Sequence, residues 1–527
     1  METKNTTSIE SLRTRMRTGA VRRWDGRVRA VDAWDGLRRD PELWFANGNC
    51  YVHLYARGQS RRGPSFRVPL RALQDARFDR IFSLFYAQAT KEVNSFNPTN
   101  PGVIELFIPP PDNLTKDAAF AWHLTTRNFF AFLFGKPLVG SLLGRAMVDL
   151  QDRLQLLRPD AARNQREVMA YLEGMGYLEF VHCPEYALAL LHYAENFRIG
   201  DLWIDAFVHC VGMNDLIESN SQLQAVSPGT RTLVARAYAE MDLHLTGVTK
   251  ALSNFLEEDF GPTYLGLSHG ARAHLERFRS FLHSFYVEKF GYWPPPAGST
   301  FSKALYRSMY FDFRSLYDYL VDLDSTDSLQ DQKPASGGIC VLQNVQAFDR
   351  RHHYVPLPHP NPLLPDTSDT PKGPAPRTLI GLRMPRGPSR SERYVNARDA
   401  LLAAANSHDL ATANAPLVKA YRRFERDCTR QPEEKVSIAD ARKVRWILIY
   451  GSLQMLVSVI RAPKEVRDTE SASYPLCALV ANLPPWLEVP DEPATPLRSS
   501  PVVEPLEAPG PPVPAVAIQP DCDTEAF

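Results

Sequence analysis

Hydrophobic and polar residues alternate over two short stretches near residue 50. Residues 43–55 read LWFANGNCYVHLY, with an Asn47-Gly48 turn signal, and residues 65–70 read SFRVPL. Alternation with a period of two is typical of strands that bury one face. We therefore predict a β-hairpin with the basic turn GQSRRGP, followed by a helix over 71–89 and a short strand within 102–111.

The hydrophobic spacing becomes helical after residue 115 and remains so to residue 296. The first helix is capped by Thr115 and ends before Gly135 and Pro137. A final long helix over 438–461 is capped by Ser437, with Asp440 three residues on. Between them, helices are predicted over 139–157, 163–175, 184–197, 200–212, 231–257, 270–290 and 301–321.

Three other segments are rich in proline or charge and cannot bury a core. The sequence therefore predicts an α+β, predominantly helical fold with disordered arms. We expect the C-terminal helical segment to pack on the main domain, because its long helix is too apolar to stand alone. The predicted divisions are a disordered basic arm (1–24), a small α+β unit (25–140), a helical domain (141–321), a disordered proline-rich linker (322–392), the C-terminal helical segment (393–487) and a disordered, proline-rich acidic tail (488–527).

The charge and cysteine content narrows the class of protein. Sixty basic and sixty acidic residues cancel, which argues against a dedicated nucleic-acid coat, although seven arginines lie within residues 13–29. The seven cysteines are widely spaced and form no CxxC pair. This pattern is typical of reduced thiols inside the cell.

The longest apolar run is WILIYGSLQMLVSVI at 446–460, and Arg445 and Arg461 flank it. Its 15 residues fall short of the roughly 20 that cross a bilayer. The N-terminus also lacks an apolar signal core. We predict that the run is a core helix and that the protein has no membrane anchor.

Residues 122–140, WHLTTRNFFAFLFGKPLVG, combine several polar groups with four phenylalanines. His123 and Arg127 lie four apart and share one helix face, while apolar residues cover most other directions. A helix that is apolar all round is buried, and buried polar groups need partners. We interpret His123, Arg127 and Asn128 as structural residues.

Motifs for catalysis or cofactor binding are weak. GLSHG at 266–270 matches G-x-S-x-G, but that motif needs a buried strand ahead of its serine, so we predict that Ser268 caps the next helix. The pairs His182-Cys183 and His209-Cys210 lack zinc-site spacing. No phosphate loop, HExxH or dinucleotide fingerprint is present. We therefore assign no catalytic, cofactor-binding or metal-binding residue.

Four long stretches resemble an uncharacterised fungal domain family. They are residues 123–140, 187–213, 271–296 and 442–469, and the similarity extends over about 25–487 without the linker. The resemblance implies a fungal intracellular protein and no particular activity.

The order hairpin, helix, strand and helices also resembles the BTB/POZ fold. FRVPLRAL (66–73) lies where the second strand enters the first helix, and FLFGKPLVG (132–140) is similar to the turn after the long helix. LALLHYAENFRIGDLWIDAFVHCV (188–211) resembles the closing helix pair, and 213–296 would be a BACK-like extension. Pro69 stands where the family commonly has a histidine, which departs from the usual homodimer groove.

These observations favour a non-enzymatic adaptor or scaffold, cytoplasmic or nuclear. The resemblance implies a protein partner, either a cullin-type ubiquitin-ligase scaffold or a second copy. Arg61 and Arg62 in the hairpin, the proline segments and the basic arm would carry the interaction. Two alternatives remain open. One is a hydrolase that uses Ser268 with His269 or His274, and the other is a nucleic-acid-associated regulator that uses the Arg13–Arg29 arm, whose affinity would fall steeply with salt.

Overall fold

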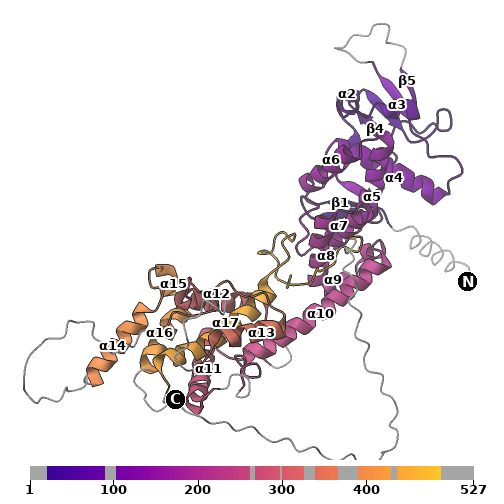
Figure 1. The fold of residues 1–527 in the computed structure, drawn as a ribbon. Coiled ribbons are helices and arrows are strands. Elements are labelled where there is room, and N and C mark those ends of the chain that lie inside the picture. The colour runs from indigo at the N-terminus through magenta and orange to yellow at the C-terminus, as the bar shows by residue number, and fades with distance from the viewer. Residues whose placement is uncertain are drawn as a thin grey trace, which may run out of the picture. The chain divides into compact units, whose positions relative to one another are not determined.

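Helices dominate the computed structural model, and two small sheets lie near the N-terminus (Figure 1). The predicted class is therefore confirmed. Residues up to Pro484 form one compact unit, and the chain from Pro485 forms a second. The basic arm to residue 19 and the tail from 488 lie outside the described residues. The structure describes residues 20–89, 102–261, 267–296, 300–325, 339–365, 390–428 and 436–487.

The predicted hairpin is present as β3 (Cys50–His53) and β4 (Phe66–Val68). Strand β6 (Ile104–Phe107), within the predicted 102–111 strand, lies parallel to β3. On its other side β6 pairs with β5 (Tyr86–Ala89), which gives the order β4-β3-β6-β5. The sheet is held by alternating apolar residues that are almost fully buried, as the period of two predicted.

The predicted continuous helix over 71–89 is wrong. The chain forms two short helices, α2 (Leu70–Asp75) and α3 (Arg80–Leu84), and then enters β5. Arg77 adopts a φ of 58°, which a helix cannot contain. Beyond Phe85 the backbone is extended, so it can pair with β6. Pairing with a neighbouring strand outweighs the local helical spacing here.

A second sheet was not predicted. It consists of β1 (Arg22–Asp25), β2 (Ala30–Ala33) and β7 (Leu138–Gly140) in the order β2-β1-β7. Residues 22–24, which the sequence assigned to the disordered arm, therefore belong to the fold. Trp24 is fully buried, while Arg23 pairs with Glu42 at 2.8 Å, so the basic strand finds a carboxylate partner.

The predicted helices after residue 115 are confirmed, with ends shifted by a few residues. Thr115 accepts a hydrogen bond from the Ala118 N–H and caps the first of them, and Gly135 follows its end with a φ of 60°. Two short elements were not predicted, namely α9 (Asn214–Ile217) and the 3-10 helix η2 (Ser221–Gln224). The predicted helices are α4 (Lys116–Leu133), α5 (Leu143–Leu157), α6 (Ala161–Gly174), α7 (Pro184–Phe197), α8 (Gly200–Gly212), α10 (Pro228–Ser253), α11 (His269–Phe290) and α12 (Lys303–Leu320).

Helix α17 (Ile438–Ile460) begins at its predicted cap Ser437 and packs against α10, α11, α12 and α13 (Val341–His352). Among the described residues, it is the one helix long and apolar enough to cross a membrane. However, 78% of its apolar window is buried inside the protein. This burial supports the interpretation of α17 as a core helix. The remaining helices are α14 (Arg390–Ala403), α15 (Leu410–Asn414) and α16 (Pro416–Cys428).

Part of the predicted linker is folded, which corrects the assignment of 322–392 to disorder. Residues 341–352 form α13, and the proline-containing segment 353–363 then follows α17. The Trp446 indole donates to the Pro360 carbonyl at 2.7 Å. Tyr450 accepts from the Leu357 N–H at 3.0 Å. Polar side chains of α17 thus satisfy a backbone that cannot form its own helix.

Candidate functional site

Arg127 joins three elements in the buried core of the N-terminal unit. Its Nε lies 2.8 Å from Asp40 Oδ2, and its Nη2 lies 2.7 Å from Glu42 Oε2. The remaining amino group donates to the Pro137 carbonyl. These contacts tie α4 to the 3-10 helix η1 (Pro41–Leu43) and to the turn before β7. The geometry supports the structural interpretation of Arg127.

Asn128 completes the edge of the second sheet. Its Nδ2 donates to the Val139 carbonyl at 2.7 Å, and its Oδ1 accepts from the Val139 N–H at 2.9 Å. The side-chain amide thereby pairs with β7 as another strand would. His123 is half-buried one turn earlier, where burial and the nearby Arg62 and Arg153 lower its pKa to about 4.

Ser268 acts as the predicted helix cap. Its Oγ accepts from the Ala271 N–H at 3.3 Å at the start of α11. His274, a predicted hydrolase partner, is fully buried, with Nε2 at 2.7 Å from an Arg445 amino group. Burial, Arg445 and Arg277 lower the pKa of His274 to about 2. The imidazole is thus held neutral by core contacts.

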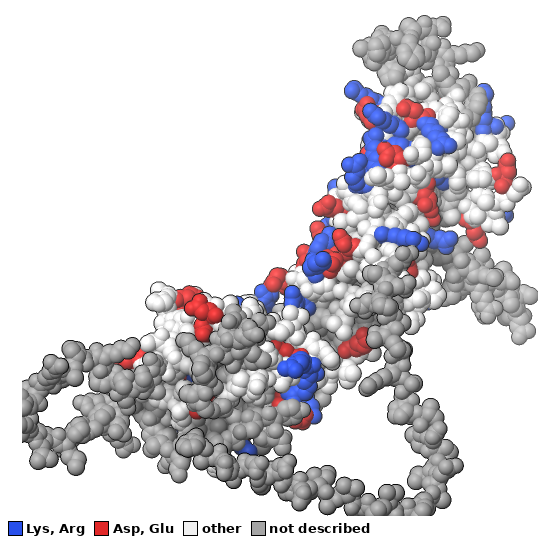
Figure 2. Space-filling model, in the orientation of Figure 1, with Lys and Arg blue, Asp and Glu red and all other residues white. Residues whose placement is uncertain are grey.

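The described arginines of the predicted basic arm contact the protein itself. Arg27 donates to the Gly174 carbonyl at 2.9 Å, and Arg29 donates to the Glu179 carbonyl at 3.3 Å. On the face in Figure 2, acidic and basic side chains are interleaved rather than gathered in one basic area. Arg13, Arg15 and Arg17 lie outside the described residues.

Two adjoining hollows of about 560 and 780 Å³ lie beside α4 and α5. They share Leu114, Trp122 and Leu156 in their walls. Leu114 and Phe120 are each 43% exposed, and Leu84 and Leu156 are close to this value. We call this surface the α4–α5 groove, and its apolar side chains are Leu84, Leu114, Phe120, Trp122 and Leu156.

Charged groups of both signs line the α4–α5 groove. Asp117, Asp149 and Asp152 face it, as does Arg145. Burial raises the pKa of Asp149 and of Asp152, because each carboxylate is partly removed from water. Arg153 lies with its guanidinium 3.8 Å from the centre of the Trp122 ring. Basic groups of a partner would find carboxylates around an apolar centre here.

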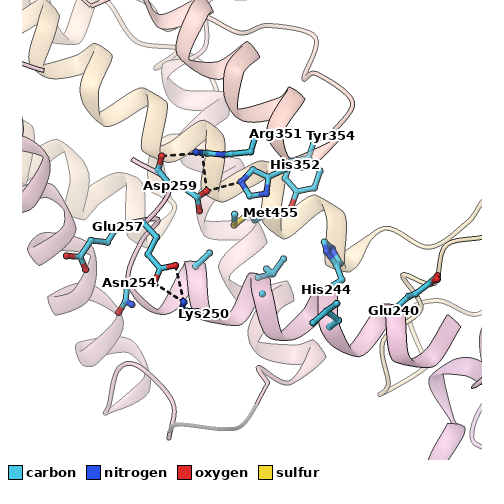
Figure 3. A pocket seen from close by; sticks show the side chains of 15 residues that line it. Glu240, His244, Lys250, Asn254, Glu257, Asp259, Arg351, His352, Tyr354 and Met455 are labelled. Atoms are coloured by element: carbon cyan, nitrogen blue, oxygen red, sulfur yellow. Dashed lines mark hydrogen bonds and ion pairs between the residues drawn. The ribbon is translucent and has the colours of Figure 1, made fainter. Parts of the chain in front are cut away.

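A third hollow of about 540 Å³ lies between α10 and the end of α13 (Figure 3). Asp259 accepts from Arg351 at 3.0 Å and from His352 at 2.9 Å on one wall. Lys250 pairs with Glu258 at 2.8 Å on the other side. We call this hollow the α10 groove. Figure 3 shows Glu240, His244 and Lys250 following one another along α10, opposite Arg351, His352 and Tyr354.

The sequence did not predict either groove. Each combines side chains from elements far apart in the chain, so their proximity depends on the tertiary fold. The exposed apolar residues Phe120 and Leu243 also occupy positions that a helical pattern cannot distinguish from core positions. Arg61 and Arg62, which were expected to be exposed, are exposed at the hairpin turn.

Comparison with known proteins identifies one segment. Residues 165–257 match the model of a domain of unknown function, DUF8004. The predicted resemblance to an uncharacterised domain family is thus confirmed over this segment, which includes α7, α8 and α10. No curated protein and no solved structure shows significant similarity to the chain.

Proposed function

We propose that this protein is a non-enzymatic adaptor inside the cell that binds a scaffold protein through the α4–α5 groove. The supporting observation is the groove itself, where four apolar side chains, each about two-fifths exposed, line two adjoining hollows that share Leu114, Trp122 and Leu156. Contiguous apolar surface of this kind marks protein-binding sites. Its burial against a partner is favourable by about 25 cal/mol for each Å².

The proposal also rests on the POZ resemblance of the sequence. In its support, hairpin β3–β4 is followed by short helices, by β5 and by β6, which lies parallel to β3. The resemblance implies a cullin-type ubiquitin-ligase scaffold as the partner. The carboxylates of Asp117, Asp149 and Asp152 favour basic residues beside the partner's apolar contact.

The two alternative functions receive no support from specific contacts. The Ser268 hydroxyl is engaged as a helix cap, and His274 is bonded to Arg445. Arg27 and Arg29 donate to carbonyl groups of the protein. We therefore extend the proposal neither to hydrolysis nor to nucleic-acid binding.

The test is affinity purification of the tagged protein from its native cells, followed by mass spectrometry. The wild-type chain should enrich a cullin-type scaffold, and Phe120→Asp should reduce that enrichment at least tenfold, because it places a charge in the apolar contact. Phe311→Asp is the matched control, since Phe311 is 54% exposed on α12 outside the groove.

All three chains should melt at the same temperature, because both phenylalanines are exposed. Equal scaffold recovery with Phe120→Asp would contradict the proposed groove, and recovery of no scaffold by the wild type would contradict the proposed function. A wild-type dimer that Phe120→Asp converts to a monomer would assign the groove to self-association instead.

A further inference from the structure

The α10 groove exposes one face of a long helix. Leu243, Gly247 and Ala251 lie four residues apart along α10 and line the hollow together. Leu243 is 74% exposed, whereas Met455 of α17 is buried at the groove. One row of the α10 wall, formed by Leu243, Gly247 and Ala251, is therefore apolar over more than two turns, and its side chains are small beyond Leu243. Glu240, His244 and Lys250 flank this row.

Gly247 is the unusual residue of this wall. It lies in the interior of α10, where glycine costs roughly 1 kcal/mol relative to alanine. A Cβ placed on Gly247 would meet no described atom within 4 Å. Packing within the described chain thus gives no reason for the missing side chain. Its absence does allow the backbone of another element to approach α10 closely.

The length of the groove fits a helix. From Glu240 to Asn254 the lining residues extend along α10 for about 21 Å, or about four turns, at 1.5 Å for each residue. The opposite wall is formed by the end of α13 and by Tyr354 (Figure 3). A second helix laid along α10 would therefore contact both walls.

The charges of the groove select a basic ligand. Asp259 is paired with Arg351 and His352, and Glu258 is paired with Lys250. Glu257 is exposed at one end of the groove. Among the described residues, Glu240 at the other end pairs with Arg236 at the surface, and such a pair is weak in water. Carboxylates thus lie at both ends of the apolar row formed by Leu243, Gly247 and Ala251.

We propose that the α10 groove is a second docking site, which takes an amphipathic α-helix of a partner protein. The apolar face of that helix lies against Gly247 and Ala251, and lysine or arginine residues near its ends pair with Glu240 and Glu257. The site is separate from the α4–α5 groove, so the inference stands whether or not that groove binds a scaffold. Two separate sites allow one chain to bring two partners together.

Binding of a labelled helical peptide to the full-length protein tests the site. The probe is a synthetic peptide of about 18 residues, four to five turns, with alanine and leucine on one face and lysine near both ends. A peptide of the same composition, scrambled to remove the helical period, is its control. Fluorescence anisotropy should show at least tenfold tighter binding of the helical peptide.

Variants locate the bound probe. Gly247→Leu should weaken probe binding at least tenfold while leaving the melting temperature unchanged or higher, because its side chain enters open space in the groove. Gly174→Leu is the matched control, since a Cβ at this glycine of α6 also meets no described atom within 4 Å. Glu257→Lys should weaken binding and make it less sensitive to salt.

Four outcomes would overturn the proposal. The helical probe could bind no better than the scrambled one, or Gly247→Leu could bind as the wild type does. Loss of binding in Phe120→Asp would place the probe in the α4–α5 groove. A wild-type dimer that Gly247→Leu makes monomeric would identify a second copy as the occupant.

Discussion

Buried arginines lie where separate elements of this protein meet. Arg442 and Arg445 of α17 both bind Glu425 of α16, and the Arg442 Nη2 to Glu425 Oε2 distance is 2.8 Å. Arg445 also contacts His274 of α11. Arg127 plays the corresponding role in the N-terminal unit. Each guanidinium carries enough donors to bind several acceptors at once.

Arg127→Ala should lower the free energy of unfolding by about 3–5 kcal/mol, because Asp40 would remain buried without its cation. Chemical denaturation measures this change. Arg236→Ala is the control, since its pair with Glu240 is exposed and should contribute less than about 1 kcal/mol. Normal stability of Arg127→Ala would contradict the structural interpretation.

The sequence predicted that Arg127 and Asn128 are buried, but not what they bind, and it did not predict that the first turns of α4 around His123 are only partly buried. A run of phenylalanines on all sides of α4 required that Arg127 be inside the protein. Asp40 and Glu42, its partners, lie 87 and 85 residues earlier in the chain and belong to no pattern that includes Arg127. Only the tertiary fold brings such residues together.

At the scale of single elements, helix α17 carries a row of buried polar side chains within its apolar surface. Tyr450 donates to Asp349 Oδ2 at 2.7 Å, and Gln454 donates to Asp349 Oδ1 at 2.8 Å. Neither partner carries a positive charge. Burial therefore raises the pKa of Asp349 above its usual 3.8, because the ionised form loses more water than these bonds replace.

This raised pKa gives a pH dependence to stability. The folded protein binds the Asp349 proton more tightly than the unfolded chain does. The contribution of Asp349 to the free energy of unfolding is therefore largest below pH 3.8, and it falls as pH rises through the folded-state pKa. Asp349→Asn cannot titrate. It should cost about 1 kcal/mol at pH 4 through one lost hydrogen bond, and this cost should shrink towards pH 7.

Urea unfolding of the wild type and of Asp349→Asn at pH 4, 5.5 and 7 measures the difference. Asp409→Asn is the control, since Asp409 is exposed at the start of α15 and its pKa is lowered by bonds to Thr412 and Ala411. The cost of Asp409→Asn in the free energy of unfolding should instead grow as pH rises, because a lowered pKa stabilises the folded protein when the carboxylate is ionised. A constant difference for Asp349→Asn would contradict the raised pKa.

Elements with their own caps and periodicity were predictable, whereas those that depend on distant partners were not. α4, α11 and α17 begin at the serine or threonine caps read from the sequence. α13 was missed because proline-rich neighbours suggested disorder. One pattern in the sequence did indicate a segment bound along α17. Polar groups recur every four residues in this apolar helix, at Trp446, Tyr450, Gln454 and Ser458.

At the scale of the whole molecule, the chain after α17 returns to the N-terminal helices. Asp205 of α8 accepts from the Arg467 backbone N–H at 3.0 Å and from its guanidinium at 2.6 Å. His209 lies 2.7 Å from the Tyr474 hydroxyl. Lys303 donates to the carbonyl of Ala472 at 2.8 Å. Residues 462–484 therefore connect α8 with the start of α12.

A chain that ends at Arg461 should be less stable than one that ends at Leu487 by at least about 3 kcal/mol, because it removes both hydrogen bonds that Arg467 donates to the buried Asp205. Thermal unfolding of both chains measures the loss. Within the longer chain, Tyr474→Phe should remove the hydroxyl's bond to His209 and cost about 1 kcal/mol. Equal melting temperatures of the two chains would contradict the stabilising role of residues 462–484.

The late position of α17 has a consequence for synthesis on the ribosome. Helices α10 to α13 pack against α17, yet α13 ends at His352 and α17 ends 108 residues later, at Ile460. At 5–20 residues per second, roughly 5 to 20 seconds pass between their completion. During this interval the faces that α17 will cover are open to water, and nascent chains in this state are natural clients for chaperones that bind apolar surface.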